Sequence, residues 1–360
     1  MRRALLPVLL LSACLLDAQS RRILYVTHSA GYRHESIEAS TQVLRALSPQ
    51  LEVTATEDLS TITEQNLRSY HAVLFFTSGE LALSADQKSA LLDFVRRGGG
   101  FGGVHSATDT LYTWPEYGEL IGGYFDGHPW VQPVRIDVED PEHPAAAHLK
   151  PSFTIMDEIY QFRNFSRNRV RVLMTLDTDS VDRNAQGAHR HTADFPISWV
   201  RQYGSGRVFY TALGHFEGTW RDVRFQQALA GALEWLTGRT NASATPRTST
   251  QSAQVALVVN AFRADPADRI APRSWISIYG SNLTSGSTMQ SGGGRSLAGT
   301  SATVAGLPIR LVFASPTQLN GLMPDGLPEG DTNLEVSSRD SPQPAVRPVA
   351  IVTSAPGCVA

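Results

Sequence analysis

The spacing of apolar residues changes once along this chain of 360 residues, and the change limits the folds open to it. From residue 22 to about residue 239, short apolar runs alternate with amphipathic stretches of helical period. This alternation is typical of an α/β domain built on a parallel sheet. Beyond residue 254, short strand-like runs are separated by Gly, Pro and Asp turns, which is typical of an all-β sandwich. We therefore expect two domains of different architecture.

A linker joins the two expected domains. Residues 240–254 are rich in Ser and Thr and contain no large apolar residue, which is typical of a linker. We assign residues 20–239 to the α/β domain and residues 255–360 to the β-sandwich.

The N-terminus has the pattern of a secretory signal peptide. Residues 1–19 contain two arginines, then an apolar stretch too short to span a bilayer comfortably, and end in small residues. Ordinary cleavage after Ala18 and a lipid anchor on Cys14, within the segment LSAC, both fit this pattern. We expect a secreted or periplasmic protein with no transmembrane span in the mature chain.

Composition excludes some functions. The formal net charge is −3 and no basic cluster exceeds a pair of arginines, so nucleic acid is not an expected partner. Apart from Cys14 the only cysteine is Cys358. The α/β domain therefore has neither a disulfide nor a catalytic thiol.

The main strands and helices of the α/β domain can be placed from the sequence. A helix that begins after Ser84 is expected to end at Gly98, because serine is a good N-cap and glycine adopts the left-handed conformation that ends helices. The other expected helices span about 35–47 and 223–238, and the expected strands span 22–27, 51–57, 71–77, 100–104 and 206–214.

The glycines of the segment GGGFGGVHSATDT, residues 98–110, formally match a dinucleotide-binding pattern. In such a pattern the glycines follow a strand and open a helix. Here they end a helix and continue into a strand, so we interpret them as permitting close packing rather than phosphate binding. The strand then ends at His105.

Three strands of this domain each lead to a histidine, namely His28, His105 and His215. Open α/β sheets bind ligands at the carboxyl ends of their strands. If the three strands are adjacent, the imidazoles converge there, and His34 and His128 are placed to join them.

Several segments resemble the ThuA family, which is named for trehalose utilisation. The resemblance covers about residues 22–238 and is carried by THSAGYRHESI, GGGFGGVHSATDTLYTWPEYGELIGGYF, HPW, DEIYQFRNFSRNRVRVLMTLD and FPISWVRQYGSGRVFYTALGHFEGTW. It implies the flavodoxin-like α/β sandwich of the class I glutamine amidotransferases and a role in carbohydrate utilisation.

The resemblance also shows what this chain lacks. In that superfamily a cysteine nucleophile lies at the strand-to-helix elbow and a later His-x-Glu supplies the base. Here the elbow residue is His105, while His215 to Glu217 superficially keep the later element. Glutamine amidotransferase chemistry is excluded because no thiolate can form at the elbow. A nucleophilic role for Ser106 is disfavoured because the G-x-S-x-G elbow is absent.

Two kinds of chemistry suit these residues. One is a divalent metal site, for example zinc, formed by His105 and His215 with one of His28, His34 or His128 and a carboxylate such as Asp109 or Glu158. The other is metal-free proton transfer by imidazole on a sugar hydroxyl or carbonyl. The sequence leaves this choice open.

Our candidate residues follow from this interpretation. The catalytic candidates are His105, His215, Asp109 and Glu217, and the candidates for binding substrate are His28, Arg33, His34, Ser106, Tyr112, Trp114, His128 and Glu158. Structural roles compete for some of them. Arg33 could pair with a carboxylate, Trp114 and Tyr112 could pack in the core, and Asp109 could cap a helix.

The C-terminal region resembles the immunoglobulin-like, TIG-type modules of secreted bacterial proteins, on the segments NAFRADPADRIAPRSWISIYGSNLT and SATVAGLPIRLVFASPTQLNGLMPDGLPEGDTNLEVSS. Such modules are accessory. The resemblance implies further strands beyond the segment APGCVA, so we expect an incomplete module.

Together these observations predict an exported protein that acts on a carbohydrate. The first hypothesis is an enzyme that hydrolyses or isomerises a disaccharide or an oxidised sugar. The second is a sugar-binding protein without turnover. The sequence leaves homo-oligomerisation open.

Overall fold

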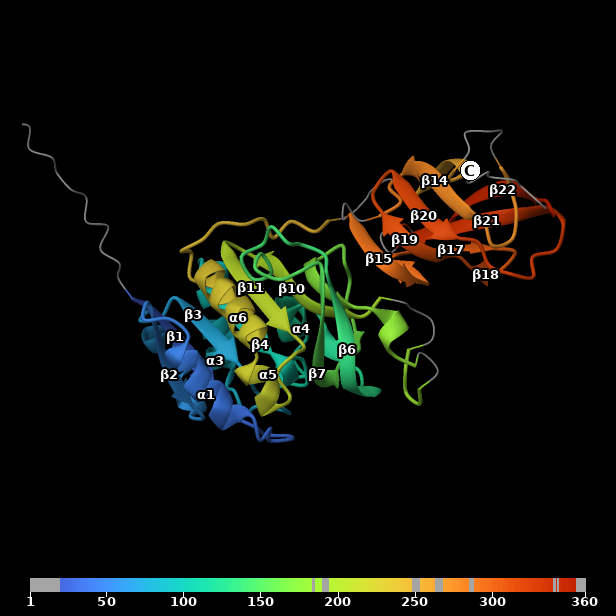
Figure 1. Cartoon of the computed structure of the whole chain (residues 1–360). Helices are drawn as coiled ribbons and strands as arrows, with labels where there is room; N and C mark the ends of the chain where they lie inside the picture. Colours follow the sequence, from blue (N-terminus) through green and yellow to red (C-terminus); the bar gives the residue numbers. More distant parts are fainter. Residues whose placement is uncertain are drawn as a thin grey trace, which may run out of the picture.

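The computed structural model describes residues 20–182, 185–189, 194–247, 253–262, 268–284, 288–338, 341 and 343–353 (Figure 1). The expected signal peptide, with Cys14, and the cysteine Cys358 lie outside the described residues. Within these ranges no helix has both the length and the apolar character needed to cross a membrane.

The N-terminal part of the chain forms one nine-stranded sheet with helices beside it (Figure 1). Its strands are β1 (Arg21–Val26), β2 (Leu51–Thr56), β3 (Ala72–Phe75), β4 (Gly100–Val104), β6 (Trp130–Val138), β7 (Ser152–Ile159), β9 (Arg171–Leu176), β10 (Pro196–Tyr203) and β11 (Gly206–Thr211), and β5 (Tyr124–Phe125) pairs separately with β8 (Phe162–Arg163). The α-helices are α1 (Ile37–Ala46), α2 (Glu64–Leu67), α3 (Ala85–Arg96), α4 (Pro115–Ile121), α5 (Glu217–Arg221) and α6 (Val223–Leu236), and the 3-10 helices are η1 (Leu59–Thr61), η2 (His105–Thr108) and η3 (Thr178–Ser180).

The sheet is parallel on one side only, which corrects the expectation of a parallel sheet. Its strand order is β2-β1-β3-β4-β11-β10-β9-β6-β7. The pairs from β2 to β11 are parallel, and those from β11 to β7 are antiparallel. The change occurs where the two residues Gly204 and Ser205 join β10 to β11, because so short a turn can connect only antiparallel strands.

The expected strands and helices of the parallel half are present, with ends that differ by a few residues. The Ser84 hydroxyl accepts a hydrogen bond from the backbone N–H of Gln87, whose side chain bonds back to the N–H of Ser84. This reciprocal cap fixes the start of α3. Gly98 follows α3 and Gly238 follows α6, both with positive φ, as expected for glycines that end helices.

Helices cover both faces of the sheet, so the α/β part has two cores. On β1, Ile23 and Tyr25 pack with α1, α5 and α6, whereas Leu24 and Val26 pack with α3 and α4. Successive side chains of a strand point to opposite faces, and here both faces are buried. This explains why β1 is a continuous apolar run in the sequence.

The C-terminal part is all-β, as the turn-rich pattern predicts, and has its own core. Its strands are β12 (Gln254–Asn260), β13 (Arg269–Ile270), β14 (Trp275–Ser281), β15 (Met289–Gly294), β16 (Ser296–Leu297), β17 (Thr300–Val304), β18 (Leu307–Pro308), β19 (Arg310–Ala314), β20 (Gln318–Leu322), β21 (Gly330–Ser338) and β22 (Ala345–Ile351). They form one sheet in the order β12-β14-β20-β19-β15 and another in the order β13-β22-β21-β17-β16.

A buried histidine makes this fold sensitive to acid. His143 is 1% exposed and packs against the Trp235 ring, with its Nδ1 accepting the N–H of Ala145. Burial lowers the pKa of His143 from 6.5 to about 4, with Arg171 and Arg207 adding to the effect. At pH values between about 6.5 and about 4, His143 binds a proton in the unfolded chain but not in the folded chain. The folded state therefore loses stability as the pH falls through this range.

We therefore predict that His143→Asn reduces the acid sensitivity of folding. The asparagine oxygen can still accept a backbone N–H but does not titrate. Between about pH 7 and about pH 4.5, the free energy of unfolding of the wild type should fall by up to about 3 kcal/mol more than that of the variant. Urea denaturation at the two pH values measures this difference. Equal pH dependence in the two proteins would contradict the prediction.

Candidate functional site

His105 lies at the elbow that follows β4. It is fully buried and has a φ of 47°, in the left-handed region that residues other than glycine rarely adopt. Such strain costs on the order of 1 kcal/mol and persists where the surrounding structure enforces it. The backbone thus turns sharply and directs the imidazole to the carboxyl edge of the sheet.

The glycines before His105 are required for packing, as the sequence analysis inferred. A Cβ at Gly102 would lie 2.5 Å from a methyl group of Leu74, and one at Gly103 would lie 2.8 Å from a methyl group of Ile121. Both distances are shorter than real carbon contacts. These glycines let α4 and neighbouring strands approach β4 closely.

Three polar atoms meet at this edge. His105 Nε2 lies 3.2 Å from His215 Nδ1 and 3.4 Å from Glu158 Oε2, and His215 Nδ1 lies 3.2 Å from the same carboxylate oxygen. His105 comes from the end of β4, His215 from the loop after β11, and Glu158 from β7. We call this group of three side chains the His-Glu cluster.

His34 completes the surroundings of the cluster. Its ring is 5% exposed and lies edge-on to the rings of His105 and His215, with centroids 4.7 and 5.2 Å away. Its Nδ1 lies 3.4 Å from the hydroxyl of Ser106. One ring nitrogen of His34 and one potential metal-ligand atom of each cluster member all lie within 4.8 Å of one another.

Asp157 holds the loop that carries His215. One carboxylate oxygen accepts the N–H of Gly214 at 2.7 Å, and the other accepts the N–H groups of His215 at 3.1 Å and Glu158 at 2.9 Å. Asp157 is fully buried, and burial raises its pKa. Asp157 is not among the site residues expected from the sequence, although two consecutive acids at the end of an apolar strand are a signal for a buried polar site.

The cluster shifts the pKa values of its members. Burial opposes the negative charge of Glu158, but the adjacent His105 and His215 outweigh it and hold the pKa of Glu158 well below its usual range. Burial likewise disfavours the charged form of His215, yet Glu158 raises its pKa overall. Burial, with the nearby histidines, lowers the pKa of His34 to about 3. His34 is therefore neutral at physiological pH.

Aromatic residues and His128 form one side of the cluster. The Tyr160 ring lies 4.3 Å from that of His105, centroid to centroid, and packs on Phe125 at 4.4 Å. His128, which is about half exposed, has its Nδ1 3.3 Å from Glu158 Oε1, the oxygen that does not touch the other histidines. His128 therefore contacts Glu158 but is not part of the convergent group; of the three further histidines that the sequence offers as metal ligands, His34 is the one that lies with His105 and His215.

Three expected site residues lie outside the cluster. Half-buried His28 follows β1, but its Nδ1 is 2.9 Å from the carbonyl of Glu57. Arg33 pairs with the Glu57 carboxylate at 2.8 Å, and both side chains are exposed. Glu217 is exposed and pairs with Arg221 one turn later in α5. The His-x-Glu resemblance misled here because α5 begins at Glu217 and directs it to solvent.

Three residues after the elbow have structural contacts. Tyr112 donates a hydrogen bond to Asp109 at 2.6 Å. Asp109 does not cap the following helix, since the N-cap residue of α4 is Trp114. Trp114 is 7% exposed and stacks on Tyr117, so it belongs to the core rather than to a sugar platform.

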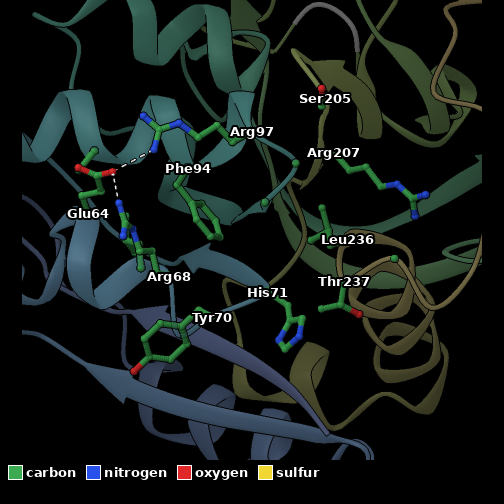
Figure 2. A pocket seen from close by; sticks show the side chains of 15 residues that line it. Glu64, Arg68, Tyr70, His71, Phe94, Arg97, Ser205, Arg207, Leu236 and Thr237 are labelled. Atoms are coloured by element: carbon green, nitrogen blue, oxygen red, sulfur yellow. Dashed lines mark hydrogen bonds and ion pairs between the residues drawn. The ribbon is translucent and has the colours of Figure 1, made fainter. Parts of the chain in front are cut away.

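A separate pocket lies where the strands begin, and it contains none of the candidate residues (Figure 2). Gly98 and Gly99, which precede β4, line it. Arg68 and Arg97 in this pocket both pair with Glu64 (Figure 2). Arg207, which also lines this pocket, donates to the backbone carbonyls of Trp235 and Thr240. We take the His-Glu cluster as the candidate site because it lies at the carboxyl edge of the sheet, where open α/β sheets bind their ligands.

We predict that Asp157→Asn destabilises the fold by about 1–3 kcal/mol. An amide offers one acceptor oxygen in place of two, so at least one N–H of the three that Asp157 now accepts loses its partner. Urea denaturation measures the loss. Asp86→Asn, on the exposed side of α3, is the control and should change stability by less than about 0.5 kcal/mol. Equal stability of the two variants would refute the role given to Asp157.

Comparison with known proteins supports the resemblance. Solved structures similar to this one include a putative ThuA-like protein from Bacteroides uniformis, with 24% identity, 64% of this chain and 95% of that chain covered, and a TM-score of 0.53. Another from Parabacteroides merdae has 19% identity, covers 62% of this chain and 92% of that one, and has a TM-score of 0.50. At these identities the likeness concerns the fold.

A search of the curated proteins finds no match. The family model described as "ThuA: Trehalose utilisation" matches residues 22–236, which include every member of the His-Glu cluster together with His34 and Asp157. That description supports a role in carbohydrate utilisation. On this match, which spans more than half of the sequence, the chain belongs to the ThuA family.

Proposed function

We propose that this protein is an exported enzyme that processes a disaccharide or an oxidised sugar at the His-Glu cluster. The observation that carries the proposal is the convergence of His105, His215 and Glu158 on one point at the carboxyl edge of the sheet. Open α/β sheets bind their ligands at this edge. The description of the family supplies the class of substrate.

The cluster has the groups that acid/base chemistry on a sugar requires. Hydrolysis and isomerisation both need a proton to be removed from one oxygen or carbon and delivered to another oxygen. Two imidazoles and a carboxylate within 3.4 Å of one another can accept and return such a proton. The neighbouring Ser106 hydroxyl can hydrogen-bond a sugar hydroxyl.

An exposed aromatic ring at the rim supports a sugar as the ligand. Tyr32 is 61% exposed, and its ring lies edge-on to that of His34, 4.9 Å away. Large exposed aromatic side chains beside a polar site favour contact with ligands that have both apolar faces and hydroxyls, as sugars do. Tyr32 is not among the site residues expected from the sequence, because a lone tyrosine in a loop has no distinctive pattern.

We also propose a fold type for each of the two parts of the chain. The strand order β2-β1-β3-β4-β11 and the left-handed elbow at His105 support a flavodoxin-like core of the glutamine amidotransferase type. With histidine at the elbow, glutamine amidotransferase chemistry is not part of the proposed function. The all-β part is proposed as an immunoglobulin-like accessory module, and the N-terminal sequence pattern supports export.

We predict that His105→Asn and His215→Ala each abolish turnover of the substrate while sugar binding persists. Asparagine tolerates the left-handed backbone of residue 105 better than most residues, so the variant removes the imidazole and keeps the elbow. A screen of trehalose and keto-disaccharides for product formation, with binding measured by calorimetry, tests this. Glu217→Gln is the matched control and should retain turnover, because Glu217 faces solvent.

The alternative is a sugar-binding protein without turnover. It would be indicated if the wild type binds a sugar from the screen but consumes none, and if both histidine variants lose only affinity. That result would overturn the proposed enzymatic function.

A further inference from the structure

We infer that the His-Glu cluster binds one divalent transition-metal ion through His105 Nε2, His215 Nδ1 and Glu158 Oε2. The inference deepens the proposed function, since it concerns the same site, but metal binding can be measured without any substrate. It rests on where the protons of the cluster can lie, on the spacing of the three atoms and on the groups that support them.

The tautomer of His105 leaves its Nε2 without a proton in the neutral ring. His105 Nδ1 lies 2.7 Å from the carbonyl oxygen of Ala212, which can only accept a hydrogen bond. Nδ1 must therefore carry the ring proton. The lone pair of Nε2 then points at His215 Nδ1 and at Glu158 Oε2.

These contacts cannot all be satisfied by neutral imidazoles. His215 Nδ1 can offer one proton at most, yet it faces two acceptors, His105 Nε2 at 3.2 Å and Glu158 Oε2 at 3.2 Å. The contact of 3.4 Å between His105 Nε2 and Glu158 Oε2 then brings two lone pairs together. Convergent lone pairs in a buried site repel one another unless a proton or a metal ion lies between them.

The spacing of the three atoms matches the first shell of a small metal ion. Ligands about 2.0–2.1 Å from a tetrahedral zinc ion lie about 3.3–3.4 Å from one another. The three distances in the cluster are 3.2, 3.2 and 3.4 Å. An ion can therefore be accommodated with little movement of the side chains.

His34 is placed to be a fourth ligand or to border an open position. It is buried, and one of its ring nitrogens lies within 4.8 Å of the other three donor atoms. Three protein ligands with an open fourth position are typical of catalytic zinc sites, whereas four ligands are typical of structural ones. The longer separation of His34 favours the open arrangement.

The groups behind the cluster have the form of a second shell. Metal-binding histidines almost always donate their other N–H to a carbonyl or carboxylate, and His105 donates to Ala212. Asp157 fixes the backbone of His215 and of Glu158. His128 contacts the oxygen of Glu158 that is left outside the cluster. Each proposed ligand is thus oriented before any ion binds.

The donor set indicates which ions fit. Two imidazole nitrogens and one carboxylate oxygen suit zinc and also iron(II), manganese(II) or cobalt(II), whereas calcium and magnesium prefer oxygen ligands alone. A divalent ion here would act as a Lewis acid toward a sugar hydroxyl or carbonyl oxygen. This role is compatible with the acid/base groups around it.

Metal analysis of the purified full-length protein tests the inference. Protein prepared without chelators or an affinity tag that binds metal should contain about one transition-metal ion per chain by mass spectrometry of elements. After treatment with a chelator, addition of cobalt(II) should produce visible absorption bands of a tetrahedral or five-coordinate ion, saturating at one equivalent. Metal-free protein that binds neither zinc nor cobalt at micromolar concentrations would overturn the inference.

Variants identify the ligands. His215→Ala and Glu158→Gln should each lower the bound metal at least tenfold, whereas His148→Ala, which replaces an exposed histidine outside the cluster, should retain it. Circular dichroism verifies that each variant is folded. If all variants keep their metal, the ion is bound elsewhere and the assignment of ligands is wrong. A metal-free protein that still turns over a sugar would refute this inference and leave the proposed function intact. A protein that binds the metal but turns over no sugar would support this inference and contradict the proposed enzymatic function.

Discussion

The parallel pairing of β4 with β11 is the constraint on which the site depends. The pairing places Thr211 beside Val104, so that the chain leaves both strands at the same edge of the sheet. His105 follows one strand directly, and His215 follows the other after a short loop. Backbone hydrogen bonds between two buried strands are among the most rigid features of a protein, and the two imidazoles therefore meet with little freedom.

The antiparallel half of the sheet supplies the carboxylates of the site. β7 is the last strand in the sheet order, yet it contacts α5 just after His215. Asp157 and Glu158 are consecutive residues of β7, but one binds backbone N–H groups and the other faces the imidazoles. A buried carboxylate is stable only when it is paired or hydrogen-bonded. Both acids meet this condition, since Asp157 accepts three backbone N–H groups and Glu158 contacts two imidazoles. The antiparallel strands are thus part of the site and not merely an extension of the sheet.

The parallel half was predictable from local signals. The apolar runs, the Ser84 cap and the glycines after α3 and α6 determine the backbone only of residues close to them in the chain. The sequence alone therefore indicates these elements. The antiparallel half was not predicted. Its strands are amphipathic in part and, apart from the short turn between β10 and β11, are separated by long loops. Local patterns do not reveal which of these strands pair with one another. For the same reason Asp157 and Tyr32 were not selected, whereas the histidines at strand ends were.

The sequence by itself determined the kinds of residue available, the α/β and all-β character of the two parts, and the histidine in place of a thiol at the elbow. The tertiary structure decided which of these residues act together. It brought His34, His105, His215 and Glu158 within reach of one another and left His28, Arg33 and Glu217 with exposed partners. The physical reason is that a cluster of polar atoms depends on distances between residues far apart in the chain, and only the packed sheet and its loops determine those distances.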